Sequence, residues 1–281
     1  MPGGGAACDA IGQQAEGGGG LQALVAASLA DRIVTVGPAE LAGVLGLDDL
    51  PLQVGAPHNV GVTTQRAKRG ARVPQASGRP SGAPRLLRAL PPQTWVGVDE
   101  AGRGPLAGPV VACAIALADP PPPGLADSKE LSPAKRLQLA RSLLAASSRV
   151  AVAIGSHAVI DRLNIHRATM AAMARAVGEL EGPFDCVWVD GPHRLDLPPG
   201  MHQHAVVDAD ALVACVAAAS IVAKVVRDRI MEALDALYPG YAFARHKGYP
   251  TPDHRQALAR LGPSPIHRRS FVLARGRPHP L

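Results

Sequence analysis

Acidic side chains follow three of the apolar runs in this chain. Asp99 and Glu100 come directly after WVGV, Asp190 ends CVWVD, and Asp208 and Asp210 follow HAVV. In α/β proteins, functional sites lie where strands end and open into loops. Taken singly, each acid also fits a cap or a turn, and Asp210 could simply cap the helix expected after it.

As a group, these acids indicate a site for a divalent cation. Carboxylates that converge on one place repel one another, and each is pushed toward its neutral form. A cation removes that penalty, and oxygen ligands without a His or Cys pattern favour Mg²⁺ or Mn²⁺ over Zn²⁺. In a basic protein such a site indicates phosphodiester hydrolysis, in which one metal activates water and another stabilises the leaving 3′ oxygen.

A glycine-rich segment, AGRGPLAGP, comes directly after the first pair of acids, with glycines at 102, 104 and 108. It fits a tight hairpin turn. It also fits a loop whose backbone approaches a sugar-phosphate chain, with Arg103 meeting a phosphate. The segment is not a GxGxxG that follows a strand, and no GxxxxGK[ST] occurs, so the nucleotide-binding loops are not supported.

Further basic and aromatic residues lie later in the chain. Lys129 lies in ADSKELS, Lys224 follows AAASIVA, and Tyr249 lies in ARHKGYPT. Each fits a surface or packing role, but a tyrosine among basic residues can also stack on a sugar or base. The segment HRRSF could hold phosphates or form a solvated turn, and His246 and His267 are weaker candidates.

The charge of the chain favours a polyanionic partner. The formal net charge is +6 and the pI is about 9.5, which favours nucleic acid first and an anionic membrane surface second. No apolar run approaches the roughly 18–20 residues that span a bilayer, and no secretory signal is evident. The four cysteines form no CxxC pair. We therefore expect a cytoplasmic protein with reduced thiols and no membrane association.

Five short β-rich runs must position the acids: WVGV, VVACAIAL, VAVAIG, CVWVD and HAVV. Ser132-Pro133 predicts the start of a helix. Helical spacing predicts two further helices, over about 157–180 and 211–237, each ending before a Gly-Pro or Pro-Gly pair. Early strands follow one another and later ones alternate with helices, which indicates an α/β or α+β protein with a mixed, helix-covered sheet.

Residues 1–92 have a different composition. They contain glycine runs and one stretch that fits a short helix, LQALVAASLADRI; residues 61–90 hold seven Arg or Lys and no acid. This composition is typical of a linker that buries no core of its own. We expect a low-complexity, largely disordered extension over 1–92, a catalytic domain over 93–275 and a tail over 276–281. A basic arm that contacts nucleic acid is the alternative.

Seven motifs together resemble one known family. In order they are GVDEAGRGPLAGPVVACA, DSKELS, LNIHRATMAAMARAV, VDG, AASIVAKVVRD, HKGYPT and HRRSF. Over about residues 94–272 the chain resembles bacterial ribonuclease HII. The resemblance implies the ribonuclease H-like α/β fold, with a mixed five-stranded sheet flanked by helices and a helical C-terminal part.

The resemblance also implies an activity and a set of residues. The activity is metal-dependent cleavage of RNA in RNA–DNA hybrids and on the 5′ side of ribonucleotides embedded in duplex DNA, leaving 3′-hydroxyl and 5′-phosphate ends, as in ribonucleotide excision repair. By resemblance, the carboxylates that bind Mg²⁺ or Mn²⁺ are Asp99, Glu100, Asp190 and Asp210. The substrate-binding residues are Gly102, Arg103, Gly104, Lys129, Lys224 and Tyr249. Within this set the glycine segment would read the ribose 2′-OH and Tyr249 would stack on the next sugar.

The surroundings of Asp210 depart from the family pattern. The family has Gly-Asp-Ser where this chain has Ala-Asp-Ala, and Asp208 lies two residues upstream as a competing candidate. Alignment through AASIVAK favours Asp210. A nucleic-acid-binding module without catalysis and a related two-metal nuclease for another duplex are the alternative functions. We expect a monomer, and the sequence does not indicate whether a sliding clamp is a partner.

Overall fold

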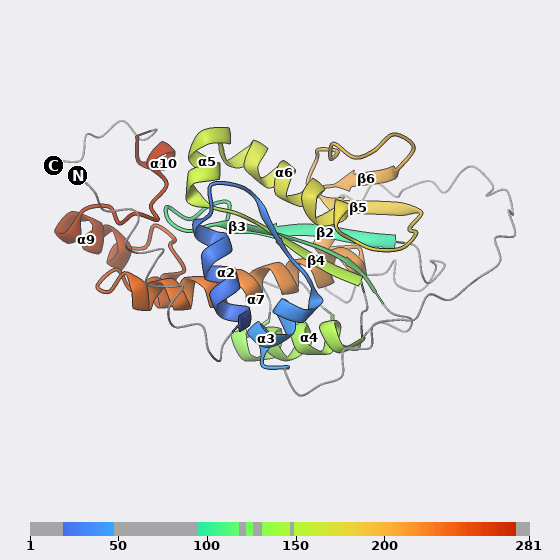
Figure 1. Cartoon of the computed structure of the whole chain (residues 1–281), viewed down its shortest axis with the longest axis horizontal. Helices are drawn as coiled ribbons and strands as arrows, with labels where there is room; N and C mark the ends of the chain where they lie inside the picture. Colours follow the sequence, from blue (N-terminus) through green and yellow to red (C-terminus); the bar gives the residue numbers. More distant parts are fainter. Residues whose placement is uncertain (1–18, 48–94, 118–121, 126–130, 147–148, 274–281) are drawn as a thin grey trace, which may run out of the picture.

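The computed structural model describes residues 19–47, 95–117, 122–125, 131–146 and 149–273 (Figure 1). Its centre is one six-stranded sheet with the order β1-β4-β3-β2-β5-β6. The strands are β1 (Val34–Val36), β2 (Trp95–Ala101), β3 (Val110–Ala116), β4 (Arg149–Gly155), β5 (Cys186–Asp190) and β6 (His202–Val206). Pairs β1–β4, β4–β3 and β3–β2 are antiparallel, whereas β2–β5 and β5–β6 are parallel. The expected mixed sheet is confirmed, with six strands in place of five.

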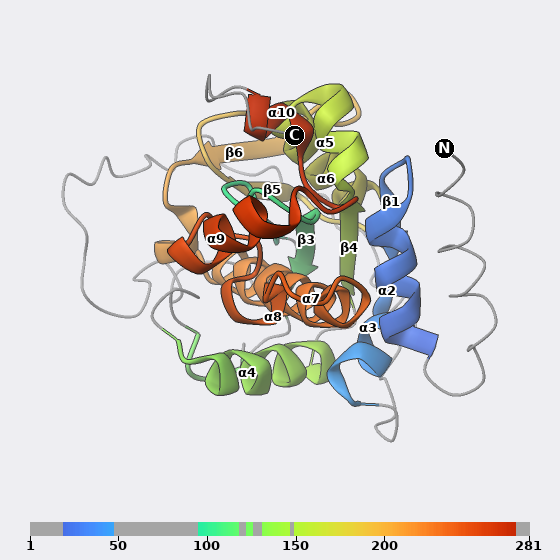
Figure 2. The same cartoon turned by 90° about the vertical axis from the view of Figure 1, so that its left-hand side faces the viewer.

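The sheet lies between two helical layers (Figures 1 and 2). On one face α6 (Ile165–Gly178) packs against β2, β3 and β4. On the other face α7 (Ala214–Leu237) packs against β2 and β3, and α4 (Pro133–Ala146) lies outside α7. The approach of α7 requires Gly97 on β2, because a Cβ there would lie 2.0 Å from the carbonyl carbon of Cys215. This close contact fixes the start of α7 beside Gly97, and later residues of the helix, Ser220 and Lys224, line the same pocket as the acids at the end of β2.

Two of the expected helices differ from their predicted bounds. The stretch expected as one helix over 157–180 is divided into α5 (His157–Leu163) and α6. The residue between them, Asn164, has φ 66°, and its side-chain oxygen accepts a hydrogen bond of 3.0 Å from Arg167 N. Asn164 therefore ends one helix and caps the next. The helix expected from 211 begins at Ala214, because the residues around Asp210 form a separate 3₁₀ turn, Ala209–Ala211.

Part of the N-terminal extension belongs to the core, so the expectation of an extension without a buried core is wrong for residues 19–47. That segment forms α2 (Gly19–Leu29), β1 and α3 (Pro38–Leu45). Leu24 and Leu41 are fully buried in one hydrophobic cluster with residues of α4 and α7. Arg141 Nε on α4 donates a 2.6 Å hydrogen bond to the carbonyl of Leu45. The short helix expected in this region is confirmed; residues 48–94 and the tail lie outside the described residues.

The C-terminal part is helical, as expected, with α8 (Phe243–His246), α9 (Pro252–Leu261) and α10 (Arg269–Leu273). Helix α8 packs against α7, and α10 lies against α5 (Figure 2). Among the described residues, no helix has both the length and the hydropathy required to cross a membrane. Cys113, Cys186 and Cys215 are buried free thiols.

Candidate active site

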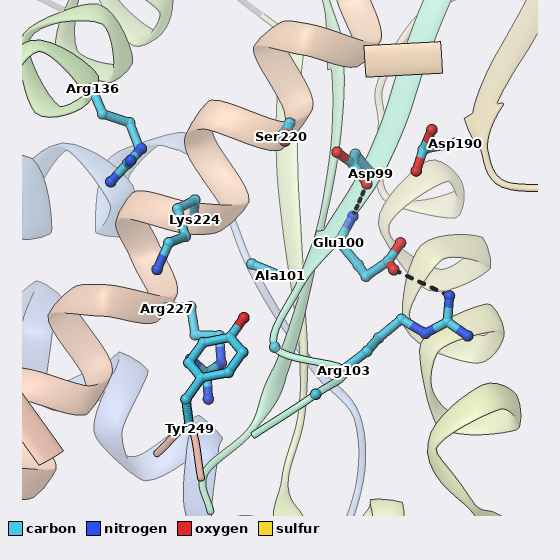
Figure 3. A pocket seen from close by; sticks show the side chains of 12 residues that line it. Asp99, Glu100, Ala101, Arg103, Arg136, Asp190, Ser220, Lys224, Arg227 and Tyr249 are labelled. Atoms are coloured by element: carbon cyan, nitrogen blue, oxygen red, sulfur yellow. Dashed lines mark hydrogen bonds and ion pairs between the residues drawn. The ribbon is translucent and has the colours of Figure 1, made fainter. Parts of the chain in front are cut away.

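A pocket of about 270 Å³ opens at the end of β2 where the acids lie (Figure 3). Residues of β2, the glycine loop, β5, α4 and α7 form its wall, and Tyr249 closes it from the segment between α8 and α9. The lining residues are Asp99, Glu100, Ala101, Gly102, Arg103, Gly104, Arg136, Asp190, Ser220, Lys224, Arg227 and Tyr249. Of the ten residues predicted for the site, eight therefore meet in one pocket. Asp210 is absent from its lining, and Lys129 lies outside the described residues.

Three carboxylates occupy one side of the pocket (Figure 3). Asp99 is 5% exposed, and its Oδ1 accepts a 2.6 Å hydrogen bond from the backbone N of Glu100. Burial raises the pKa of Asp99 well above its ordinary value, and the charges of Glu100 and Asp190 raise it further, while a hydrogen bond from Ser220 opposes them. Burial also raises the pKa of Glu100, and the nearby Arg103 opposes that rise. The cluster is therefore electrostatically unfavourable when every member is ionised.

These carboxylates fit a hard divalent cation by their chemistry. Asp99, Glu100 and Asp190 offer oxygen ligands, and their mutual repulsion is the penalty that a bound cation offsets. In the part of the chain that the structure describes, no group of three or more His, Cys, Asp or Glu side chains is arranged to hold a metal as it stands. The donor types and the charge therefore support a cation site, whereas a complete set of ligands is not in place.

Asp210 lies beside the pocket rather than in its lining. Asp210 is 3% exposed and lies in the 3₁₀ turn Ala209–Ala211. The turn is attached to the site because Ala209 N donates a 2.8 Å hydrogen bond to Asp190 Oδ1. The cap position of α7 is Val213, so Asp210 does not cap that helix. The competing candidate, Asp208, is exposed, is also absent from the pocket lining and has φ 55°.

The opposite wall of the pocket is basic (Figure 3). Lys224 Nζ forms an ion pair with Asp228 Oδ1, and Arg136 Nη1 lies 3.8 Å from Asp228 Oδ2. Arg136, Ser220 and Arg227 also line the pocket and were not predicted from the sequence. The two residues on α7 could have been predicted, because Ser220, Lys224 and Arg227 have the spacing of one helix face. Arg136 belongs to α4 and carries no comparable signal.

The glycine loop and Tyr249 face each other at the mouth of the pocket. The Tyr249 side chain is exposed, and a Cβ on Gly104 would lie 3.4 Å from its Cε1. Gly102 has φ +101°, and a Cβ there would lie 2.1 Å from Arg227 Nε, so only glycine fits. Arg103 is half-exposed, with its Nη1 3.4 Å from Glu100 Oε1. The backbone of the glycine loop and the aromatic ring of Tyr249 therefore border the same part of the pocket.

The protein has a mixed sheet with acids at the end of a central strand, helices on both faces of the sheet and a helical C-terminal part. This arrangement defines an α/β protein of the ribonuclease H-like fold. The family described as Ribonuclease HII matches residues 96–274. The chain belongs to the ribonuclease HII family and is a ribonuclease H, a hydrolase that acts as an endonuclease.

Curated relatives and solved structures agree with this assignment. Ribonuclease HII of Geobacter sulfurreducens is 49% identical over 180 residues, which cover 64% of this chain and 82% of that protein. Ribonuclease HII of Laribacter hongkongensis is 54% identical over 181 residues, which cover 62% of this chain and 89% of that protein. Ribonuclease H2 from Pyrococcus horikoshii superposes with a TM-score of 0.55 at 28% identity, covering 65% of this chain and 95% of that one. The Archaeoglobus fulgidus RNase HII, solved as a complex with PCNA, superposes with a TM-score of 0.52 at 25% identity. The match covers 64% of this chain and 94% of that one.

Proposed function

We propose that this ribonuclease H cleaves the RNA strand of RNA–DNA hybrids and the 5′ side of ribonucleotides embedded in duplex DNA, leaving 3′-hydroxyl and 5′-phosphate ends. The observation that carries the proposal is a pocket in which three carboxylates lie next to a glycine loop and an aromatic ring. The carboxylates are groups for cutting a phosphodiester, and the loop and ring are groups for recognising a sugar.

Asp99, Glu100 and Asp190 would hold Mg²⁺ or Mn²⁺, with Asp210 as the proposed fourth carboxylate. When bound, the cation supplies an activated water and stabilises the leaving 3′ oxygen. Ser220 donates a hydrogen bond to Asp99 and so favours its ionised form. The Glu100 carboxylate pairs with Arg103, whose half-exposed guanidinium would meet a phosphate of the substrate.

Recognition of RNA rests on the glycine loop. The ribose 2′-OH is the only sugar group that separates RNA from DNA, so a site that reads it must bring hydrogen-bonding groups against the sugar. Gly102 and Gly104 have no side chains, and their backbone lines the pocket directly. The exposed Tyr249 ring stacks on the sugar that follows the ribonucleotide.

Phosphates of the substrate are proposed to bind along the basic wall. Lys224 and Arg136 share one carboxylate, Asp228, so their combined charge remains positive. Lys129, which lies outside the described residues, is proposed for the same role by its place in DSKELS. Cytoplasmic location and a monomeric state stay predictions. The Archaeoglobus fulgidus structure contains PCNA, and a sliding-clamp partner for this chain likewise stays a prediction, testable by co-purification with a clamp.

Cleavage of three matched duplexes tests the proposed function. The substrates are a DNA duplex with one embedded ribonucleotide, the same duplex without it, and a long RNA–DNA hybrid, each with Mg²⁺, Mn²⁺ or EDTA. We expect cleavage of the two RNA-containing duplexes only, and only with metal, with end-labelled products showing the 5′-side cut. Cleavage of the all-DNA duplex, or full activity in EDTA, would contradict the proposal.

A further inference from the structure

Arg268 holds the glycine loop from its buried side. Arg268 is fully buried, and all five of its N–H groups donate to loop carbonyls at 2.6–3.1 Å. Its acceptors are the carbonyls of Gly102, Arg103, Pro105, Gly108 and Pro109. No donor of this side chain is left for a phosphate. Arg268, the first arginine of the HRRSF segment that could have held phosphates, is therefore a support for the loop.

A second buried arginine reinforces the same loop. Arg227, 1% exposed, donates to the carbonyls of Pro109 at 3.0 Å and Ala107 at 3.3 Å. Its Nη1 donates to the carbonyl of Lys247 at 3.0 Å, two residues before Tyr249. The carbonyls of the loop are thus turned toward two guanidinium groups, away from the mouth of the pocket.

His267, the neighbour of Arg268, connects to Tyr249 through a chain of buried rings. His254 Nδ1 lies 2.9 Å from the carbonyl of Tyr249, which can only accept, so Nδ1 carries the proton. His254 Nε2 is then an acceptor, and His267 Nε2, at 3.0 Å, is its donor. His267 Nδ1 accepts from the backbone N of Ser264 at 2.8 Å. Every ring nitrogen in this chain has one role, and each histidine is neutral.

Backbone bonds join the two recognition elements as well. Tyr249 N donates to the carbonyl of His246 at 2.9 Å, so both backbone groups of Tyr249 are held. Leu106 N in the glycine loop donates to the carbonyl of Gly248 at 2.8 Å, and Arg268 N donates to the carbonyl of Leu106 at 2.8 Å. The loop, the tyrosine segment and the residues 267–268 therefore form one hydrogen-bonded unit.

We propose that the adjacent residues His267 and Arg268 are positioning residues that fix the gap between the glycine loop and the Tyr249 ring, and thereby set the selection of a ribonucleotide sugar. The inference rests on the proposed function, in which these two elements contact the sugar at the cleavage point and the sugar after it. His267 fixes the tyrosine side of the gap through His254, and Arg268 fixes the loop side. Because both elements are already held in place, neither has to become ordered when the substrate binds, and binding of the ribose 2′-OH does not pay that entropy.

Kinetics of His267 variants on the ribonucleotide-containing duplex test the tyrosine side. His267→Leu removes the donor to His254, and we expect KM to rise about 10-fold while kcat changes less than about 3-fold. His267→Gln places an amide donor at similar reach and should recover most of the loss. In a Tyr249→Ala background, His267→Leu should change KM by less than about 2-fold, because its effect passes through that ring. An equal KM rise in both backgrounds overturns the proposal.

If circular dichroism shows that His267→Leu does not fold, Ser264→Ala provides the test in its place. It removes only the hydroxyl, which lies 2.8 Å from His267 Nδ1. We expect a smaller rise in KM, about 3-fold, that again disappears with Tyr249→Ala. Persistence of that rise without the tyrosine, or no rise at all, overturns the proposal in the same way.

Binding by Arg268→Lys tests the loop side. Lysine keeps the charge but offers three donors from one atom in place of a planar fork of five. In an Asp99→Asn background that prevents cleavage, we expect the ratio of Kd values for all-DNA and ribonucleotide-containing duplexes to fall about 5-fold. Arg269→Lys, at the exposed neighbouring position, should leave that ratio unchanged. Arg227→Lys replaces Arg268→Lys if the latter does not fold.

The outcomes separate this inference from the proposed function. If the wild-type chain cuts neither RNA-containing duplex, the proposed function fails. Suppose that the wild type cuts them, but Arg268→Lys weakens binding of the all-DNA and the ribonucleotide-containing duplex equally, or the rise in KM caused by His267→Leu does not depend on Tyr249. In either case only the positioning role fails.

Discussion

The backbone amide of Ala209 donates a 2.8 Å hydrogen bond to Oδ1 of Asp190. The bond joins the end of β5 to the 3₁₀ turn that carries Asp210, although Asp210 is not part of the pocket lining. The Asp190 side chain also lines the pocket beside Asp99 and Glu100. Asp190 is therefore both a candidate ligand and the anchor of the turn.

Asp190→Asn separates these two roles, because asparagine keeps a carbonyl oxygen for the Ala209 amide but loses the charge. We expect kcat on the ribonucleotide-containing duplex to fall at least about 100-fold, with an unchanged circular dichroism spectrum. Asp185→Asn, at the exposed residue just before β5, is the matched control and should keep kcat within about 2-fold. Near-normal activity of Asp190→Asn would remove Asp190 from the cation site.

Cation binding should also be visible without activity. The pKa of Asp99 is raised by burial and by its acidic neighbours, so the ionised cluster destabilises the folded state at neutral pH and the penalty disappears below the unfolded value near 3.8. We expect Asp99→Asn to raise the Tm of the metal-free protein at pH 7. Saturating Mg²⁺ or Mn²⁺ should raise the Tm of the wild type by several degrees and that of Asp99→Asn much less. Equal metal-induced shifts in the two proteins, measured by calorimetry, would contradict a site at Asp99.

The strands that carry the acids could be predicted because their patterns are local. Buried strands appear as continuous apolar runs, and β3 is buried at all seven positions. Ser132-Pro133 predicted the start of α4 for the same reason: the Ser132 hydroxyl accepts a hydrogen bond from Lys135 N. The sequence patterns alone do not establish that Asp99 and Asp190 meet; the parallel pairing of β2 with β5 brings the same ends of both strands together.

Features that depend on distant contacts were not predictable. Three-residue β1 is a strand only because β4 offers an unpaired edge more than a hundred residues away. Arg136 reaches the pocket because α4 lies against α7, which its own sequence does not encode. The role of Arg268 depends on five carbonyls more than 150 residues upstream, so the sequence shows only an arginine in a basic segment.

The N-terminal segment should contribute to the stability of the catalytic domain. Leu24 on α2 is fully buried in the cluster that includes α4 and α7, whereas Leu21 on the same helix is exposed. We expect Leu24→Ala to lower the free energy of unfolding by about 2–4 kcal/mol, from lost burial and the cavity left behind. Leu21→Ala should change it by no more than about 0.5 kcal/mol. Equal effects in urea unfolding would show that this segment does not pack as described.

Buried His267 should make the protein sensitive to acid. Burial, followed by the nearby His254, lowers the pKa of His267 from 6.5 to about 4. Between those values the unfolded chain binds a proton that the folded chain does not, so stability is complete above pH 6.5 and falls as the pH drops toward 4. The shift corresponds to roughly 3 kcal/mol. We expect the free energy of unfolding of the wild type to fall more between pH 7 and pH 4.5 than that of His267→Gln. Parallel pH profiles for the two proteins would show that His267 does not carry this sensitivity.

Two glycines of the pocket should respond differently to the same substitution. At Gly102, φ is +101° and a Cβ would lie 2.1 Å from Arg227 Nε and 2.7 Å from the carbonyl oxygen of Pro109. Gly102→Ala should therefore lower the free energy of unfolding by about 3 kcal/mol or more, from backbone strain and steric overlap.

Gly104→Ala tests the gap itself, because its Cβ would only touch the Tyr249 ring, at 3.4 Å. We expect stability within about 1 kcal/mol of the wild type. The added methyl group narrows the space for a sugar, so KM for the ribonucleotide-containing duplex should rise about 10-fold or more, and Tyr249→Ala should relieve part of that rise. If Gly104→Ala binds and cuts this duplex like the wild type, the space beside Gly104 and the Tyr249 ring does not contribute to binding of the substrate sugars.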